Sequence, residues 1–90
     1  MVTVRAKPGR ESDLRRWFSE SMPEVRAWPG CESLDVYVDQ GNPDTIILIQ
    51  RWRTLEDHEV CNRWRKENGR TARLNEISEG PRPVTILEPA

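Results

Sequence analysis

The chain has 90 residues, of which 36% are hydrophobic and 32% charged, and its formal net charge is −1 at pH 7. This length predicts a single domain, residues 1–90, with one modest core. The balanced charge argues against a nucleic-acid partner, and no apolar run approaches the roughly 18–20 residues of a membrane span.

The first half of the chain predicts a strand, a helix and a hairpin. Apolar and polar residues alternate over residues 2–6, which indicates a short strand. The next apolar residues have the spacing of one helix face, and Pro23 should kink that helix or start a second turn. They are Leu14, Trp17, Phe18 and Met22. Two further strands, at 34–38 and 45–52, are joined by a short turn and should form an antiparallel hairpin.

The second half predicts two helices and a final strand. Thr54 is placed to cap a helix, with Asp57 at the acidic position of a capping box, and Gly69 ends this helix. Its core-facing residues are expected to be Asp57, Val60, Cys61 and Trp64. A further short helix should end at Gly80-Pro81, and the last strand is expected at 84–87.

The order of these elements predicts an α+β fold of the ferredoxin-like βαββαβ type. Its four-stranded antiparallel sheet would carry both long helices on one face. The third strand is nevertheless apolar on both sides, with Ile46 and Leu48 on one face and Ile47 and Ile49 on the other. Leaving an isoleucine side chain in water costs about 1.5–3 kcal/mol. We therefore expect a homodimer that packs its sheets together and buries Ile47, Ile49 and Leu87, unless the C-terminal tail covers the same face.

Sequence features also bear on compartment and cofactors. The N-terminal segment lacks the basic and apolar regions of a secretory signal, so we expect a cytoplasmic protein. Its two cysteines have no zinc-like spacing, and no nucleotide-binding glycine motif or metal-ligand cluster occurs. Basic residues such as Arg63 and Arg65 are interspersed with acids, as on a solvated helix face. We therefore expect reduced thiols, no metal and no cofactor.

Four stretches resemble a known family: VRAKPGRESDLRRWF, PGCESLDVYVD, IILIQRW and EGPRPVTILEP. Together they are similar to the antibiotic biosynthesis monooxygenase (ABM) domain family of the dimeric α/β-barrel superfamily, over nearly the whole chain. The resemblance implies a dimeric α/β barrel and a cofactor-independent monooxygenase acting on an electron-rich aromatic, quinol-like or polyketide-like substrate. It equally admits a non-oxidative ligand-binding or accessory protein, or an isomerase or cyclase, because members share the fold and not the chemistry.

The resemblance also places the chemistry in a cleft between the helices and the sheet. Many members carry a histidine nine residues after the aromatic that ends the third strand, and counting from Trp52 this position is Cys61. The only histidine is His58, three residues earlier. Haem-degrading members need an asparagine in the first strand, which VTVRA lacks. Haem is therefore not expected.

The candidate site residues each have a functional and a structural interpretation. His58 is either a base for a phenol or enol, or a half-exposed helix residue. Cys61 is either a reactive thiolate beside His58 or a small buried core residue. Trp17 and Trp64 would form an aromatic wall or belong to the core. Tyr37 either joins the dimer face or donates a hydrogen bond in the cleft, and Arg51 either pairs with an acid or holds a substrate oxyanion. The remaining candidates for contact with a small planar organic ligand are Trp52 and Asn62.

Overall fold

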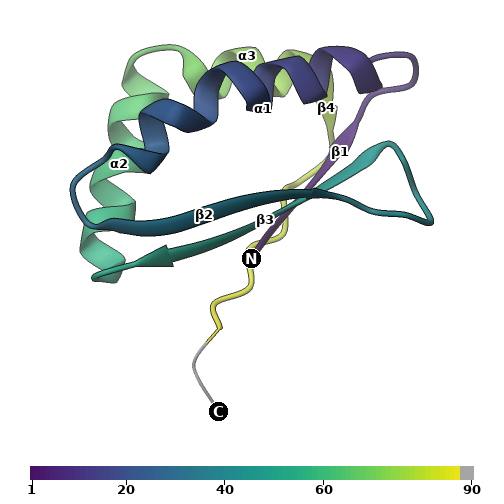
Figure 1. Ribbon diagram of the computed structural model, residues 1–90. Helices are drawn as coiled ribbons and strands as arrows, with labels where there is room; N and C mark the ends of the chain where they lie inside the picture. The colour runs from purple at the N-terminus through teal and green to yellow at the C-terminus, as the bar shows by residue number, and fades with distance from the viewer. Residues whose placement is uncertain (88–90) are drawn as a thin grey trace.

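The computed structural model describes residues 1–87 and shows one four-stranded sheet covered by helices on one face (Figure 1). The elements are β1 (Val2–Ala6), α1 (Glu11–Arg26), β2 (Cys31–Val38), β3 (Thr45–Trp52), α2 (Leu55–Glu67), α3 (Arg70–Ile77) and β4 (Ser78–Glu79). The strand order is β2-β3-β1-β4, and every neighbouring pair is antiparallel. This confirms the predicted ferredoxin-like α+β class. No helix within residues 1–87 has the length and apolar character needed to cross a membrane.

Helix α1 forms as its periodicity predicts, and it runs through Pro23 as one element. Its buried residues form a single face against the sheet. They are Leu14, Trp17, Phe18, Met22 and Val25. Proline lies in the last turn, where the loss of one backbone donor interrupts little of the helix.

The start of α2 is built by a capping interaction and by a close approach to the end of the preceding hairpin. The Asp57 backbone N–H donates to Thr54 Oγ1 at 3.1 Å, as the capping motif predicts. The Asp57 carboxylate accepts from Arg53 Nε at 3.0 Å rather than from the cap backbone. Gly30 lies against this carboxylate with φ +90°, and a Cβ there would come under 3.0 Å from Asp57. Glycine is therefore required at the turn that precedes β2.

Two expectations about the second half were wrong. Val60 is 42% exposed, so the buried side of α2 is narrower than its spacing suggests. The last strand begins at Ser78 and is only two residues long, and Val84 makes a single bridge to Val2. Gly80, with φ +70°, and the following proline interrupt the ladder, because the backbone turns and proline lacks an N–H donor. Beyond this break the tail still follows β1, with the Thr85 N–H donating to the Met1 carbonyl at 2.8 Å.

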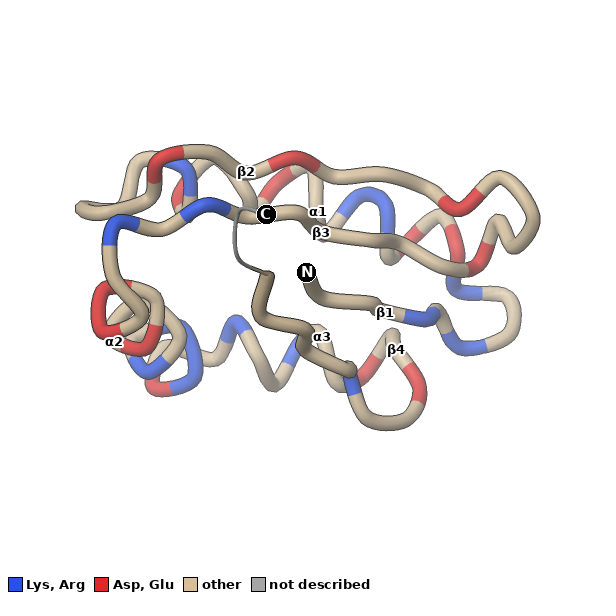
Figure 2. Tube along the Cα trace, turned by 90° about the horizontal axis from the view of Figure 1, so that it is seen from below, with Lys and Arg blue, Asp and Glu red and all other residues tan. Residues whose placement is uncertain are grey.

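The sheet face opposite to the helices is only partly covered. Ile46 and Leu48 are buried beneath the helices, whereas Ile47 is half-buried, Ile49 is 43% exposed and Tyr37 is 52% exposed. From below, the central parts of β1 and β3 show no charged residues (Figure 2). The tail drops away from the sheet on this side (Figure 1). Up to residue 87 it therefore does not cover Ile49 or Tyr37, so this alternative to a partner chain is not supported.

Candidate functional site

A cavity of about 440 Å³ lies between the inner face of the sheet and the helices. This volume falls in the range of sites for small organic ligands. Much of its wall is apolar and comes from β1, α1, β3 and α3, including Val4, Trp17, Phe18, Met22, Leu48 and Leu74. Its polar wall comes from β3, α2, α3 and the tail, with Gln50, His58, Asn62, Arg65, Asn75 and Arg82. An apolar chamber with a few polar groups suits a planar organic molecule.

His58 is held by a stacking contact on one ring face and by a hydrogen bond at its edge. The ring stacks on Trp52, with centroids 5.1 Å apart and planes at 27°. Its Nε2 lies 3.2 Å from Asn62 Nδ2. An amide nitrogen only donates, so Nε2 is the acceptor and a neutral His58 carries its proton on Nδ1. Trp52 is itself fixed, because its Nε1 donates to Gln50 Oε1 at 3.0 Å.

Burial lowers the pKa of His58 below its ordinary value of 6.5. Removal of water disfavours the charged imidazolium, so the ring is mostly neutral at pH 7. A neutral imidazole with an acceptor nitrogen in an apolar chamber is able to receive a proton from a ligand.

A second groove of about 220 Å³ meets the cavity at His58. Trp52, Leu55 and the tail residues Thr85–Leu87 line it. The two spaces have Val2, Gln50, His58 and Val84 in common. His58 thus lies where the chamber opens toward the tail, and Leu87 is on the wall of that opening.

Arg65, like Arg82, is a charged residue of the cavity that sequence reasoning missed. Its Nε and Nη2 atoms are buried and find no hydrogen-bond acceptor among the described residues. The guanidinium carbon lies 5.1 Å from the ring centroid of Trp17, which forms part of the wall. Burial lowers the pKa of Arg65 from its ordinary value, although an arginine remains charged at neutral pH. The available signal was spacing, because positions 58, 62 and 65 share one face of a helix.

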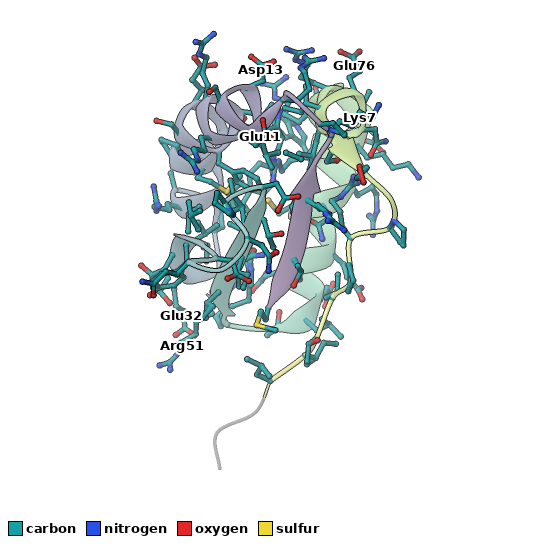
Figure 3. All side chains as sticks on the ribbon, turned by 90° about the vertical axis from the view of Figure 1, so that its right-hand side faces the viewer. Lys7, Glu11, Asp13, Glu32, Arg51 and Glu76 are labelled. Carbon is teal, nitrogen blue, oxygen red and sulfur yellow. The ribbon has the colours of Figure 1, made fainter. Side chains whose placement is uncertain are left out.

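The other sequence candidates lie away from this cavity. Cys61 is 1% exposed within the core, and burial raises the pKa of its thiol, so it is protonated at neutral pH. Trp64 packs on Trp28 with centroids 5.3 Å apart. Tyr37 is exposed on a strand position facing away from the helices, and Arg51 points outward at the same end of the sheet as Glu32 (Figure 3). The structure therefore brings His58, Asn62, Trp17 and Trp52 together and leaves the other four outside.

The fold and the cavity define the class: a ferredoxin-like α+β domain with a ligand-sized chamber between helices and sheet. Within that class the chain belongs to the antibiotic biosynthesis monooxygenase family, which residues 1–68 match. No curated protein matches the chain.

Solved structures agree on the fold. The Rv0793 protein of Mycobacterium tuberculosis superposes with a TM-score of 0.85 at 24% identity, covering 99% of this chain and 90% of that one. A structure described as an antibiotic biosynthesis monooxygenase gives 0.82 at 19% identity, covering 100% and 99%. The PA3566 protein of Pseudomonas aeruginosa gives 0.73 at 23% identity, covering 96% and 90%. At these identities the likeness concerns the fold alone.

Proposed function

We propose that this protein is a cofactor-independent monooxygenase that oxidises an electron-rich phenolic or enolic aromatic substrate in the cavity. The observation that carries the proposal is His58, a neutral imidazole held by Asn62 and Trp52 at the mouth of an apolar chamber of about 440 Å³. Family membership supports the reaction class.

The proposed reaction requires only a base and a hydrogen-bond donor from the protein. A substrate hydroxyl replaces the Asn62 amide as the donor to His58 Nε2 and gives up its proton there. The released amide N–H then donates to the oxyanion and stabilises its charge. The electron-rich anion reduces O₂ directly. One oxygen atom becomes a carbonyl at a carbon that loses two hydrogens, and the other leaves as water, so no external reductant is needed.

Oxygen consumption tests this proposal. Hydroxyanthrones and hydroquinones are supplied with and without protein, and the quinone product is quantified against the O₂ consumed. We expect sustained turnover with an anthrone at one O₂ per carbonyl formed, and a loss of about 100-fold or more in His58→Gln. Glu67→Gln, at an exposed position near the end of the same helix, is the matched control. A protein that accelerates none of these oxidations is not an oxygenase of this kind.

One observation favours the non-oxidative alternative. Cys61, at the position where many family members carry a histidine, is a buried, protonated core residue. An isomerase, a cyclase or a ligand-binding accessory protein would use the same cavity without consuming O₂. Binding of a planar phenol with no turnover would identify this alternative.

We also propose that a second copy of the chain covers the bare sheet face. Ile47, Ile49 and Tyr37 lie on neighbouring strands, since Tyr37 pairs with Ile47 in the β2–β3 register. A two-fold axis packs the same patch of both chains together, so a dimer needs no second complementary surface. Leu87 is 61% exposed on a tail that projects to the same side, where it would gain contacts with the second chain (Figure 1).

A further inference from the structure

We propose that the cavity binds a planar aromatic carboxylate and that the Arg65 guanidinium holds its carboxylate group. This inference rests on the proposed function, because it names the substrate class of the same site. It starts from the position of the two unpartnered nitrogen atoms on the side chain.

Nε and Nη2 form one edge of the planar guanidinium, with their N–H groups parallel. This edge matches the two oxygens of a carboxylate in a bidentate pair, the strongest arrangement that arginine offers. Both atoms lack a protein acceptor among residues 1–87, and both are buried. A single phenolate oxygen accepts from both only through bent hydrogen bonds, whereas each carboxylate oxygen accepts one N–H in a straight line. The free edge therefore favours a carboxylate over a phenol at this end of the cavity.

The charges around Arg65 support an anionic ligand. Among the described residues lining the cavity, the ionisable side chains are His58, Arg65 and Arg82, and none is acidic. Glu24 is close enough to act on Arg65 electrostatically, but its carboxylate accepts from Arg70 Nη2 at 3.3 Å. The Arg82 guanidinium donates to Asn75 Oδ1 at 2.6 Å. Arg65 is thus the cation of the cavity with a buried guanidinium edge, Nε and Nη2, that has no acceptor among residues 1–87.

The spacing along α2 sets the size of the ligand. Arg65 follows His58 by seven residues on the same helix face, with Asn62 between them, which corresponds to about 10 Å along the axis. A carboxylate at Arg65 and an oxidised phenolic ring at His58 are then opposite ends of one fused-ring molecule. Trp17 lies beneath the guanidinium and forms part of the apolar wall next to it.

The test compares 2-naphthoate with its neutral analogue 2-naphthamide, by calorimetry and by quenching of tryptophan fluorescence. We expect the wild type to bind the carboxylate at least tenfold more tightly than the amide. Arg65→Gln should remove this preference, and Arg65→Lys should retain only part of it, because lysine keeps the charge without the fork. Arg63→Gln, exposed on the same helix, is the matched control and should leave the preference intact.

The wild-type protein provides a readout that does not depend on the folding of the variants. 2-Naphthoate should raise its melting temperature, and 2-naphthamide at the same concentration should not. Equal binding of the two compounds, or a preference that survives Arg65→Gln, would overturn the inference. Carboxylate binding without oxygen turnover on any anthrone leaves the inference standing and removes the proposed oxygenase. Turnover of an anthrone together with equal binding of 2-naphthoate and 2-naphthamide removes the inference and leaves the proposed oxygenase standing.

Discussion

Replacing Ile49 by aspartate should dissociate the proposed dimer. Ile49 is 43% exposed in the single chain, so a partner chain would bury roughly the remaining two fifths of its side chain. At about 1.5–3 kcal/mol for complete burial, this contributes about 0.6–1.3 kcal/mol per protomer. An aspartate at the interface loses this term and adds a desolvation cost of several kcal/mol per ion. A two-fold axis counts each effect twice, so the dissociation constant should rise by about 1,000-fold or more.

Light scattering and sedimentation at micromolar concentration measure the outcome. The wild type should have twice the mass of one 10.5 kDa chain, and Ile49→Asp should approach the mass of one chain. Val60→Asp is the control, since Val60 is 42% exposed, almost the same as Ile49, but lies on α2 outside the sheet. A wild type of single-chain mass, or equal dissociation by both variants, would refute the reasoning.

Three further predictions follow from individual contacts. Gly30→Ala should destabilise the fold by about 1–3 kcal/mol in urea, since alanine is strained at φ +90° and its Cβ meets Asp57. Gly9→Ala, at φ +79° with nothing within 4 Å, should show the smaller loss from φ strain alone, and equal losses would argue against the Asp57 contact. Because burial lowers the pKa of His58, the unfolded chain binds more protons than the native state just below pH 6.5. The free energy of unfolding should therefore fall as pH drops from 6.5 through the lowered pKa and stay level above 6.5. His58→Gln should lack this pH-dependent loss, and a variant with the same pH profile as the wild type would contradict the assignment to His58. Arg65→Met should raise the free energy of unfolding by about 1 kcal/mol, because it removes a buried guanidinium with unsatisfied donors. A lower denaturation midpoint would show that contact with Trp17 outweighs that cost.

Local patterns in the sequence were sufficient to predict most of the fold. Alternation over β1 and β2 and the apolar face of α1 each depend on residues close in the chain, where side-chain period and secondary structure are directly linked. Thr54 identified the start of α2 because a cap acts over three residues. The double apolar character of β3 also indicated a sheet face that the helices leave uncovered, as the exposure of Ile49 shows.

The candidate site depended on how α2 rotates and packs, which its sequence leaves open. The family resemblance placed Cys61 at the cleft and His58 beside it, whereas the apolar stripe placed Cys61 in the core. Packing buries Cys61 and turns His58 and Asn62 toward the cavity. Arg65 was interpreted as a solvated residue because acids are interspersed with the basic residues along the chain. That local pattern contains no information about Trp17, which contacts Arg65 from another helix. The short β4 likewise reflects the turn at Gly80. Which side chains converge on a cavity is decided by contacts between distant segments, and only the tertiary structure contains them.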